Sequence, residues 1–340
     1  MRLLVTGTEG YIGVRLAEVL IERGHDVVGL DCGFYREGSL YPFPRRLTQH
    51  VTKDIRQIAV EDLAGFDAVV HLAELSNDPL GEHNPKITYE INHQGSVRLA
   101  EMAKKAKVPR FVYTSSCSVY GVASKEWVDE TSEANPQTAY AECKVLVEKD
   151  LAAMADSNFS PTFLRNATAF GPSPRMRFDI VLNNLAGLAW TTKVISMTSD
   201  GTPWRPLVHV LDICEAVACS VAAPREAIHS QVFNVGDNSQ NYRVRDIAEI
   251  VASVMPGCKV TFGASGGDNR SYRVRFDKIH QQLPGFRCAR DARTGASELK
   301  AIFEQIQMTK ETFEYRAFTR LKQLRHLLNS GQIDERFCWK

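Results

Sequence analysis

The sequence lacks the features that mark membrane, secreted and metal-binding proteins. No apolar run reaches about 18 residues, so we expect no membrane span. The opening residues MRLLVT run directly into a glycine turn, and we therefore expect no secretory signal. The 8 cysteines are scattered and form no CxxC pair, which argues against zinc or any other metal site. Reduced thiols in a cytoplasmic protein fit this pattern best.

An excess of charge of either sign is also absent. The chain has 41 Lys and Arg residues against 40 Asp and Glu residues, which gives a formal net charge of +1. This balance argues against a nucleic-acid partner, because nucleic acids are bound largely through basic surfaces. The 340 residues contain no internal repeat or low-complexity tract, and they suffice for one large or two closely packed domains.

Strand and helix patterns alternate in the first half of the chain. Short apolar runs predict strands over 2–7, 26–31, 50–55, 67–73, 110–116 and 160–170. Helical periodicity predicts helices over 11–24, 87–106 and 139–155. Repeated strand–helix units indicate an α/β fold in which helices cover both faces of a Rossmann-type, doubly wound parallel sheet.

The second half of the chain mixes short strands with helices. This change predicts a smaller, interleaved C-terminal α/β substrate lobe over 171–290, beside a dinucleotide-binding domain over 1–170. Strands from about 205–240 are expected to return to that first domain. Residues 291–340 predict a charged helical extension, and its last residues, FCWK, carry aromatics able to dock onto the body or onto a partner.

The segment VTGTEGYIG places three glycines between the first strand and the first helix. Gly7 permits a tight turn, Gly10 lets the backbone approach a pyrophosphate, and Gly13 allows the helix to pack closely on the strand. The spacing is GxxGxxG and not the commoner GxGxxG. In this strand–turn–helix context it predicts a dinucleotide site, which also includes Tyr11 and Ile12 of the same turn.

An acidic residue ends the second strand. Asp31 lies 18 residues beyond Gly13, where a carboxylate accepts hydrogen bonds from the adenosine ribose hydroxyls and repels a 2′-phosphate. This position favours NAD over NADP, although Arg36 is near enough to keep NADP open. Asp54 ends the third strand and is followed by Ile55; it is a candidate partner for the adenine, or else the start of a simple turn.

The stretch YAECK places Tyr140 and Lys144 on one face of a helix. Ser116 ends the fifth strand, and in a doubly wound sheet ligands bind outside the carboxyl ends of the strands. A free tyrosine, with a pKa near ~10, is a poor base at neutral pH. A neighbouring ammonium stabilises the phenolate, and a serine hydroxyl can hold the substrate oxygen. The three residues together therefore suit proton removal from an alcohol during hydride transfer.

Several motifs recur in the order and spacing of one known family. These motifs are TGTEGYIG, HLAELS, SSCSVYG, YAECK, DGTPWRPLVHVLDI and FNVGD. On their strength, roughly residues 1–290 resemble the extended short-chain dehydrogenase/reductase family of NAD-dependent nucleotide-sugar epimerases and dehydratases. The resemblance implies a tightly held NAD, a nucleotide-diphosphate sugar as substrate, and a homodimer formed through the helices over 87–106 and 139–155.

The resemblance also implies roles for single residues. Ser116 matches the catalytic hydroxyl, Tyr140 the base and Lys144 its partner. The further cofactor-site residues that it implies are Leu72, Ala73 and, as a brace for the active-site strand, Asn92. The substrate contacts that it implies are Ser76, Ser116, Ser118, Thr168, Asn183, Arg205 and Arg270. The two arginines suit a diphosphate, but surface ion pairs would also explain them, as a helix cap would explain Asn183.

Departures from the family pattern bear on the reaction. Cys117 and Ser118 stand where 4,6-dehydratases carry an Asp-Glu pair, and removal of the C5 proton needs a carboxylate there. Cys117, one step beyond Ser116, is expected to be a buried thiol. Thr168 replaces the usual asparagine and leaves the sugar open. The pattern matches 4-epimerases best, in which oxidation at C4 gives a transient 4-keto sugar that turns and is reduced on its other face.

Other functions stay open at this point. A reductase of 4-keto-deoxysugar nucleotides would consume NAD(P)H, a dehydratase would release water, and a catalytically silent NAD or sugar-nucleotide sensor would not need the Ser–Tyr–Lys group. His71 and His209 lie in apolar strand context and are expected to be hydrogen-bonded core residues. The loop over 32–47 could gate the crevice, contact a second subunit or simply lie in solvent.

Overall fold

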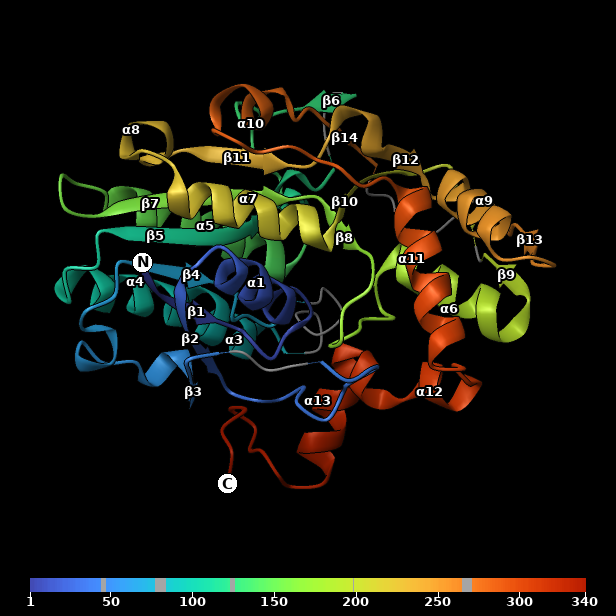
Figure 1. Cartoon of the computed structure of the whole chain (residues 1–340), viewed down its shortest axis with the longest axis horizontal. Coiled ribbons are helices and arrows are strands. Elements are labelled where there is room, and N and C mark those ends of the chain that lie inside the picture. The colour runs from blue at the N-terminus through green and yellow to red at the C-terminus, as the bar shows by residue number, and fades with distance from the viewer. Residues whose placement is uncertain (44–46, 77–83, 123–125, 198, 265–270) are drawn as a thin grey trace.

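A parallel seven-stranded sheet forms the centre of the molecule, in the order β11-β7-β5-β4-β1-β2-β3 (Figure 1). The computed structural model describes residues 1–43, 47–76, 84–122, 126–197, 199–264 and 271–340. The sheet strands are β1 (Arg2–Thr6), β2 (Asp26–Asp31), β3 (Gln49–Thr52), β4 (Ala68–His71), β5 (Arg110–Ser116), β7 (Ser160–Asn166) and β11 (Val232–Val235). The direction of winding reverses between β1 and β4, where such sheets form a crevice at their carboxyl edge.

Helices cover both faces of this sheet (Figure 1). One face carries α1 (Tyr11–Glu22) and α7 (Val210–Ala222), and the other carries α4 (Ser96–Lys105) and α5 (Ala139–Ala153). Because side chains alternate along a strand, Leu3 and Val5 enter one hydrophobic core and Leu4 enters the other. This arrangement confirms the predicted doubly wound α/β fold.

The helix predicted over 87–106 is interrupted. It consists of α3 (Pro85–Thr88), a π-helical turn η3 (Tyr89–Gly95) and α4. Single π-turns inside helices often occur at functional sites. Here the turn carries Asn92, whose side chain accepts a hydrogen bond from Leu75 N–H at 2.8 Å and donates to Leu75 C=O at 3.1 Å. Asn92 therefore fixes the loop after β4, and not the active-site strand itself.

The strand predicted over 160–170 is also interrupted, at Ala167. The N–H of Ala167 donates to Val235 C=O, which completes the pairing of β7 with β11. The chain then leaves the central sheet as β8 (Thr168–Phe170), which pairs with β10 (Trp204–His209) in a separate sheet. Of the strands expected to return to the first domain, β11 joins the central sheet and β10 does not.

Smaller sheets and helices build the rest of the molecule around a third hydrophobic core. The sheets are β12-β10-β8, β13-β9 and β14-β6, with β6 (Trp127–Val128), β9 (Val194–Ser196), β12 (Asn241–Arg243), β13 (Lys259–Thr261) and β14 (Arg273–Val274). The helices are α6 (Val181–Thr192), α8 (Arg225–Ile228), α9 (Val244–Val254), α10 (Asp277–Gln282), α11 (Ala292–Gln305), α12 (Lys310–Glu314) and α13 (Arg320–Asn329). The 3-10 turns are η1 (Ile55–Gln57), η2 (Glu61–Leu63), η4 (Cys117–Tyr120), η5 (Asn238–Gln240) and η6 (Arg316–Phe318).

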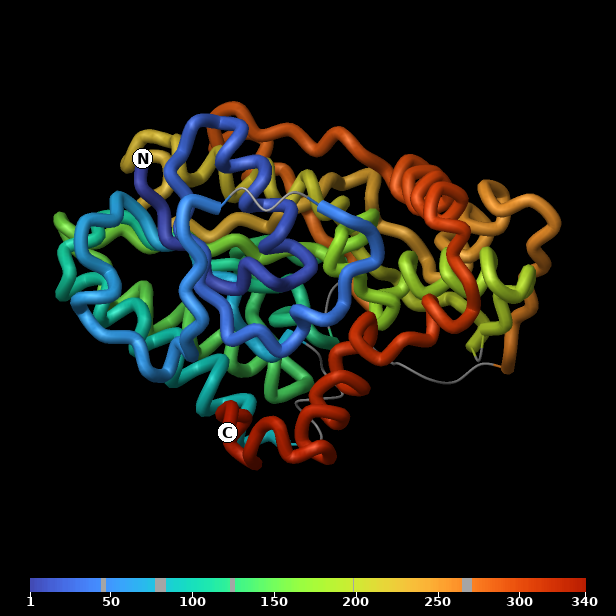
Figure 2. The backbone as a smooth tube through the Cα atoms, turned by 60° about the horizontal axis from the view of Figure 1, so that its bottom comes forward, coloured from blue at the N-terminus to red at the C-terminus, as the bar shows by residue number. Residues whose placement is uncertain are grey.

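The C-terminal extension docks onto the dinucleotide-binding half of the same chain. Figure 2 shows the chain end beside the early, blue part of the molecule. Phe337 is buried, with its ring 6.3 Å from the ring of Phe34, and Trp339 Nε1 donates to Cys32 C=O at 2.7 Å. The FCWK aromatics thus pack on the body. Within the described ranges, no helix combines the length and the apolarity needed to cross a bilayer.

Candidate active site

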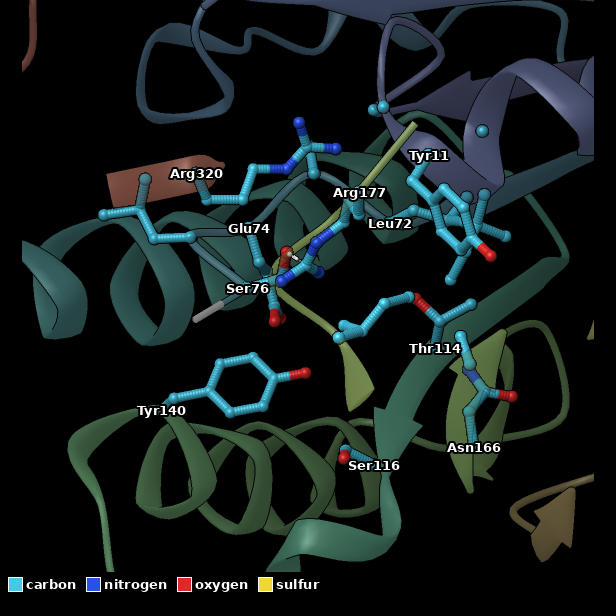
Figure 3. A pocket seen from close by; sticks show the side chains of 18 of the residues that line it. Tyr11, Leu72, Glu74, Ser76, Thr114, Ser116, Tyr140, Asn166, Arg177 and Arg320 are labelled. Carbon is cyan, nitrogen blue, oxygen red and sulfur yellow. Dashed lines mark hydrogen bonds between the residues drawn. The ribbon is translucent and has the colours of Figure 1, made fainter. Parts of the chain in front are cut away.

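A cavity of about 700 Å³ opens at the carboxyl ends of β1, β2, β4 and β5 (Figure 3). The glycine turn, the start of α1 and helix α5 line it. Phe34 and Tyr35 of the loop over 32–47 and residues 319–321 at the start of α13 complete its wall. The predicted dinucleotide turn and the predicted Tyr140 centre therefore face one space, whose volume is typical of cofactor and ligand pockets.

The glycine turn has the geometry that its spacing predicts. Gly7 has φ +80°, and a Cβ there would lie 3.0 Å from the backbone of Leu72 and Ala73. A Cβ on Gly13 would lie 2.0 Å from Gly7 C=O, so only glycine lets α1 pack against the turn. Gly10 is the N-cap of α1 and no side chain caps this helix end. The first backbone N–H groups of α1 are thus left for an anionic ligand, and the turn fits a dinucleotide diphosphate.

Asp31 and Asp54, the two predicted adenosine contacts, have different surroundings at the cavity. The carboxylate of Asp31 accepts hydrogen bonds from Glu9 N–H at 2.9 Å and Gly33 N–H at 2.7 Å. Burial raises its pKa, while these two bonds oppose the shift. Asp54 caps η1 and forms an ion pair with Arg56 at 2.6 Å, so its carboxylate is partly engaged. Arg36 stacks on Trp339, 5.2 Å from the ring centroid.

Ser116, Tyr140 and Lys144 line the cavity together. Ser116 ends β5, and its Oγ accepts a hydrogen bond from Ser118 N–H at 3.1 Å, which leaves the hydroxyl proton to donate. Helix α5 carries Tyr140 in its first turn, with the hydroxyl pointing into the cavity (Figure 3). Lys144 follows one turn later; its Nζ lies 5.5 Å from the Tyr140 ring centroid and donates to Thr114 C=O at 2.5 Å. The arrangement can hold an alcohol oxygen and accept its proton.

Sequence reasoning missed a carboxylate beside this lysine. Glu74 Oε2 lies 2.5 Å from Lys144 Nζ, and Glu74 Oε1 accepts a hydrogen bond from Tyr113 Oη at 2.6 Å. Burial raises the pKa of Glu74, opposed by the ammonium of Lys144. Burial alone would lower the pKa of Lys144, but the charges of Glu74 and Tyr140 and the hydrogen bond to Glu74 together outweigh it, and the pKa lies above its ordinary value. An acidic residue directly after an apolar strand, in the segment HLAELS, was the available signal.

Two arginines of the cavity wall were also missed. Arg177 pairs with Asp179 through Nε at 2.8 Å and Nη2 at 3.2 Å, and its Nη1 donates to Ser76 Oγ at 3.2 Å. Arg320, from α13, lies on the same side of the cavity (Figure 3). The Pro/Arg segment GPSPRMRF was a signal for Arg177, whereas nothing local to residue 320 indicates contact with a site formed by the first half of the chain.

Most of the other site residues that the sequence predicts face the cavity. Those that line it are Gly7, Gly10, Tyr11, Ile12, Gly13, Asp31, Asp54, Ile55, Leu72, Ala73, Ser76, Ser118, Thr168 and Arg205. Asn92 and Asn183 do not line it. Asn183 is buried and supports the wall from behind, accepting from Gly171 N–H and donating to Tyr11 Oη and Arg177 C=O. Arg270 falls outside the described residues.

Cys117 begins the 3-10 turn after β5, and its thiol is buried as expected. Its Sγ donates to Arg165 C=O at 3.2 Å, and burial raises the pKa of the thiol. A thiol that stays protonated and bonded to the backbone is poorly suited to remove a proton from a sugar. The position that carries a carboxylate in 4,6-dehydratases therefore supplies no base here.

The fold and the cavity define a dinucleotide-dependent enzyme of the short-chain dehydrogenase/reductase type. The model of the NAD dependent epimerase/dehydratase family matches residues 3–236, and the chain belongs to this family. Its cofactor is accordingly NAD, in agreement with the glycine turn and Asp31.

Individual relatives include both epimerases and dehydratases. A UDP-glucose 4-epimerase of Mycolicibacterium smegmatis is 33% identical over 254 residues, which cover 69% of this chain and 77% of the relative. MoeE5, solved in complex with UDP-glucose and NAD, has a TM-score of 0.77 and 26% identity, with 91% of this chain and 100% of MoeE5 covered. TunA, an NAD-dependent NDP-hexosamine 5,6-dehydratase, has a TM-score of 0.79 and 24% identity, with 89% of this chain and 98% of TunA covered. Membership of the family therefore does not decide the reaction.

Proposed function

We propose that this protein is an NAD-dependent nucleotide-sugar epimerase that acts at C4 through a transient 4-keto sugar. The observation that carries the proposal is the joint placement of Ser116, Tyr140 and Lys144 around one cavity with the glycine turn. Cys117 and Ser118 provide no carboxylate beside this group, and the carboxylate of Glu74 is engaged by Lys144 and Tyr113, so in this proposal a single acid/base centre serves the reaction. A 4-epimerase needs only one such centre, whereas water elimination needs a second.

In this proposal the side chains of the cavity transfer one proton and hold the sugar while its C4 carbon is first oxidised and then reduced. NAD, when bound, would supply the hydride acceptor and the hydride source. Tyr140 takes the proton of the C4 hydroxyl, and the ammonium of Lys144 favours the phenolate. Ser116 donates a hydrogen bond from its hydroxyl to the same sugar oxygen and keeps its proton. After the keto sugar has turned within the cavity, Tyr140 returns the proton to the oxygen.

The proposed substrate is a nucleotide-diphosphate sugar. The relative from Mycolicibacterium smegmatis is a UDP-glucose 4-epimerase, and MoeE5 was solved with UDP-glucose. Arg205 lines the cavity and offers a guanidinium for the diphosphate, a role that suits the planar donor set of arginine. The cytoplasmic location and the homodimer stay predictions, and light scattering would test the second.

The test is a panel of nucleotide sugars incubated with the purified protein without added cofactor and followed by NMR. We expect one of them to be converted to its C4 epimer until the two isomers reach equilibrium, with no consumption of NAD(P)H. Stoichiometric oxidation of added NADPH or NADH would identify a reductase instead. Release of water with a new keto group would identify a dehydratase, and binding without any conversion would identify a sensor.

A further inference from the structure

Helix α13 of the C-terminal extension brings a cation into the cofactor cavity. Thr319, Arg320 and Leu321 line the cavity, although they follow the family match by more than eighty residues, since that match ends at residue 236. The helix is held there by contacts with the first domain and the cavity wall, among them Gln323 Nε2, which donates to Phe34 C=O at 3.1 Å. Packing of the helix therefore fixes Arg320 at the cavity wall.

Arg320 is a buried cation without a bound carboxylate. Its residue is only 4% exposed, and its guanidinium lies 3.9 Å from the ring centroid of Tyr35. Among the described residues, none forms a hydrogen bond or an ion pair with that guanidinium. Asp179, which pairs with Arg177, accepts a hydrogen bond from the backbone N–H of Arg320 at 3.1 Å and acts on the guanidinium only through its charge. Burial lowers the pKa of Arg320 to about 10, with help from the charge of Arg177, so the side chain stays charged at neutral pH. Such a charge is stable in a protein when a ligand anion completes its surroundings.

The place of Arg320 along the cavity identifies the anion. Its guanidinium is within electrostatic range of Asp31, Asp179 and Arg177. Arg177 is in turn within range of Tyr11, at the start of α1, and of Tyr140. Figure 3 shows the same order, with Arg177 between Arg320 and Tyr140. A dinucleotide that runs from a ribose at Asp31 to a nicotinamide at Tyr140 places its diphosphate in the middle of this path.

We propose that Arg320, with Arg177 beside it, binds the diphosphate of NAD on the side opposite the N-terminus of α1. This proposal rests on NAD being the cofactor of the proposed function and adds a binding residue from outside the family region. The glycine turn offers backbone N–H groups to one side of the diphosphate, and Arg320 offers a guanidinium to the other. Because α13 is fixed to Phe34 and the tail to Cys32, the extension holds the cofactor in place between turnovers.

The experiment measures ligand affinity by calorimetry on protein freed of bound nucleotide. The variants are Arg320→Met, the charge-conserving Arg320→Lys, and Arg325→Met as a matched control on the exposed face of the same helix. We expect Arg320→Met to weaken binding of NAD and of ADP-ribose by about 10- to 100-fold, the loss of a charge-assisted contact. Arg320→Lys should keep part of the affinity, and Arg325→Met should bind both ligands as the native protein does.

Two controls separate cofactor binding from other roles. UDP, which carries a diphosphate but no adenosine, should bind equally to Arg320→Met and to the native protein; a loss confined to UDP would assign Arg320 to the sugar nucleotide and overturn the proposal. Thermal melting without ligand should show Arg320→Met at least as stable as the native protein, because a buried charge that forms no ion pair has been removed. A lower melting temperature, or NAD affinity within twofold of native, would also overturn it.

These affinities need no turnover, so the result does not depend on the reaction. If the native protein isomerises no nucleotide sugar, the proposed function is refuted. The NAD affinities of the native protein and of Arg320→Met would still decide the role of Arg320. Conversely, if the native protein isomerises a sugar at C4 but Arg320→Met binds NAD as tightly as the native protein, the proposed function is upheld and the proposed role of Arg320 is refuted.

Discussion

At the scale of single residues, the unusual feature of the site is an ammonium shared between two acids. Lys144 lies beside the ring of Tyr140 and 2.5 Å from the carboxylate of Glu74. An ammonium stabilises a nearby phenolate, but a carboxylate that pairs with it cancels part of that effect. Glu74 is therefore expected to set the pH range in which Tyr140 works, without itself touching the substrate.

The variant Glu74→Gln tests this role through the pH profile of turnover. With the negative charge gone, Lys144 favours the Tyr140 phenolate more strongly, and the pH of half-maximal kcat/KM on the acid limb should fall by about one unit. Glu142→Gln removes a carboxylate that bonds Tyr89 and does not line the cavity, so its profile should match the native one. An acid limb that stays in place or moves to higher pH in Glu74→Gln would refute the coupling.

At the scale of elements, His71 joins β4 to its neighbours. Its Nδ1 and Nε2 each lie 2.7 Å from a hydroxyl oxygen, those of Thr6 on β1 and Ser96 on α4. The ring is fully buried, and burial, with a smaller contribution from Lys144, lowers its pKa from 6.5 to about 3. The histidine is thus a neutral, hydrogen-bonded core residue, as its apolar strand context predicts, and His209 likewise bonds Glu298 at 2.9 Å.

The His71 ring makes the stability of the fold depend on pH. Between pH 6.5 and 3 the unfolded chain binds a proton at this ring that the folded chain does not. Its contribution is therefore fully present above about pH 6.5 and is lost on acidification, by about 1.4 kcal/mol per pH unit. Urea unfolding at pH 7 and pH 5 should show this loss in the free energy of unfolding. In His71→Gln the free energy of unfolding should change less between the two pH values. An equal change in both proteins would contradict this role of His71.

Local patterns of the sequence predict the elements and the part of the site that they carry. A strand, a glycine turn and a helix in succession indicate Gly7, Gly10 and Gly13, and helical spacing indicates Tyr140 and Lys144. The π-turn around Asn92 and the break at Ala167 were not predictable, because each depends on pairing with a distant backbone. Hydrophobic periodicity indicates which face of a helix or strand is buried, but it does not indicate where the helix or strand is interrupted.

At the scale of the whole molecule, the site is completed by residues that lie far apart in the sequence. The loop over 32–47 supplies Phe34 and Tyr35, and the extension supplies Arg320. Their meeting depends on packing of the last residues, including Phe337, against the first domain. A pattern within the extension shows a helix with charged residues, but it cannot show which surface that helix will cover. For this reason the role of Arg320 had to come from the structure.

The proposed epimerase function depends most directly on Tyr140, the residue that accepts the proton when hydride leaves the sugar. The decisive measurement is the NMR rate of sugar-nucleotide isomerisation by Tyr140→Phe without added cofactor, with Tyr89→Phe, a tyrosine outside the cavity lining, as the matched control. We predict a rate reduced by about 10²- to 10⁴-fold in Tyr140→Phe, with NAD affinity within twofold of native and with Tyr89→Phe close to native in both. Isomerisation by Tyr140→Phe at a near-native rate would contradict the central claim.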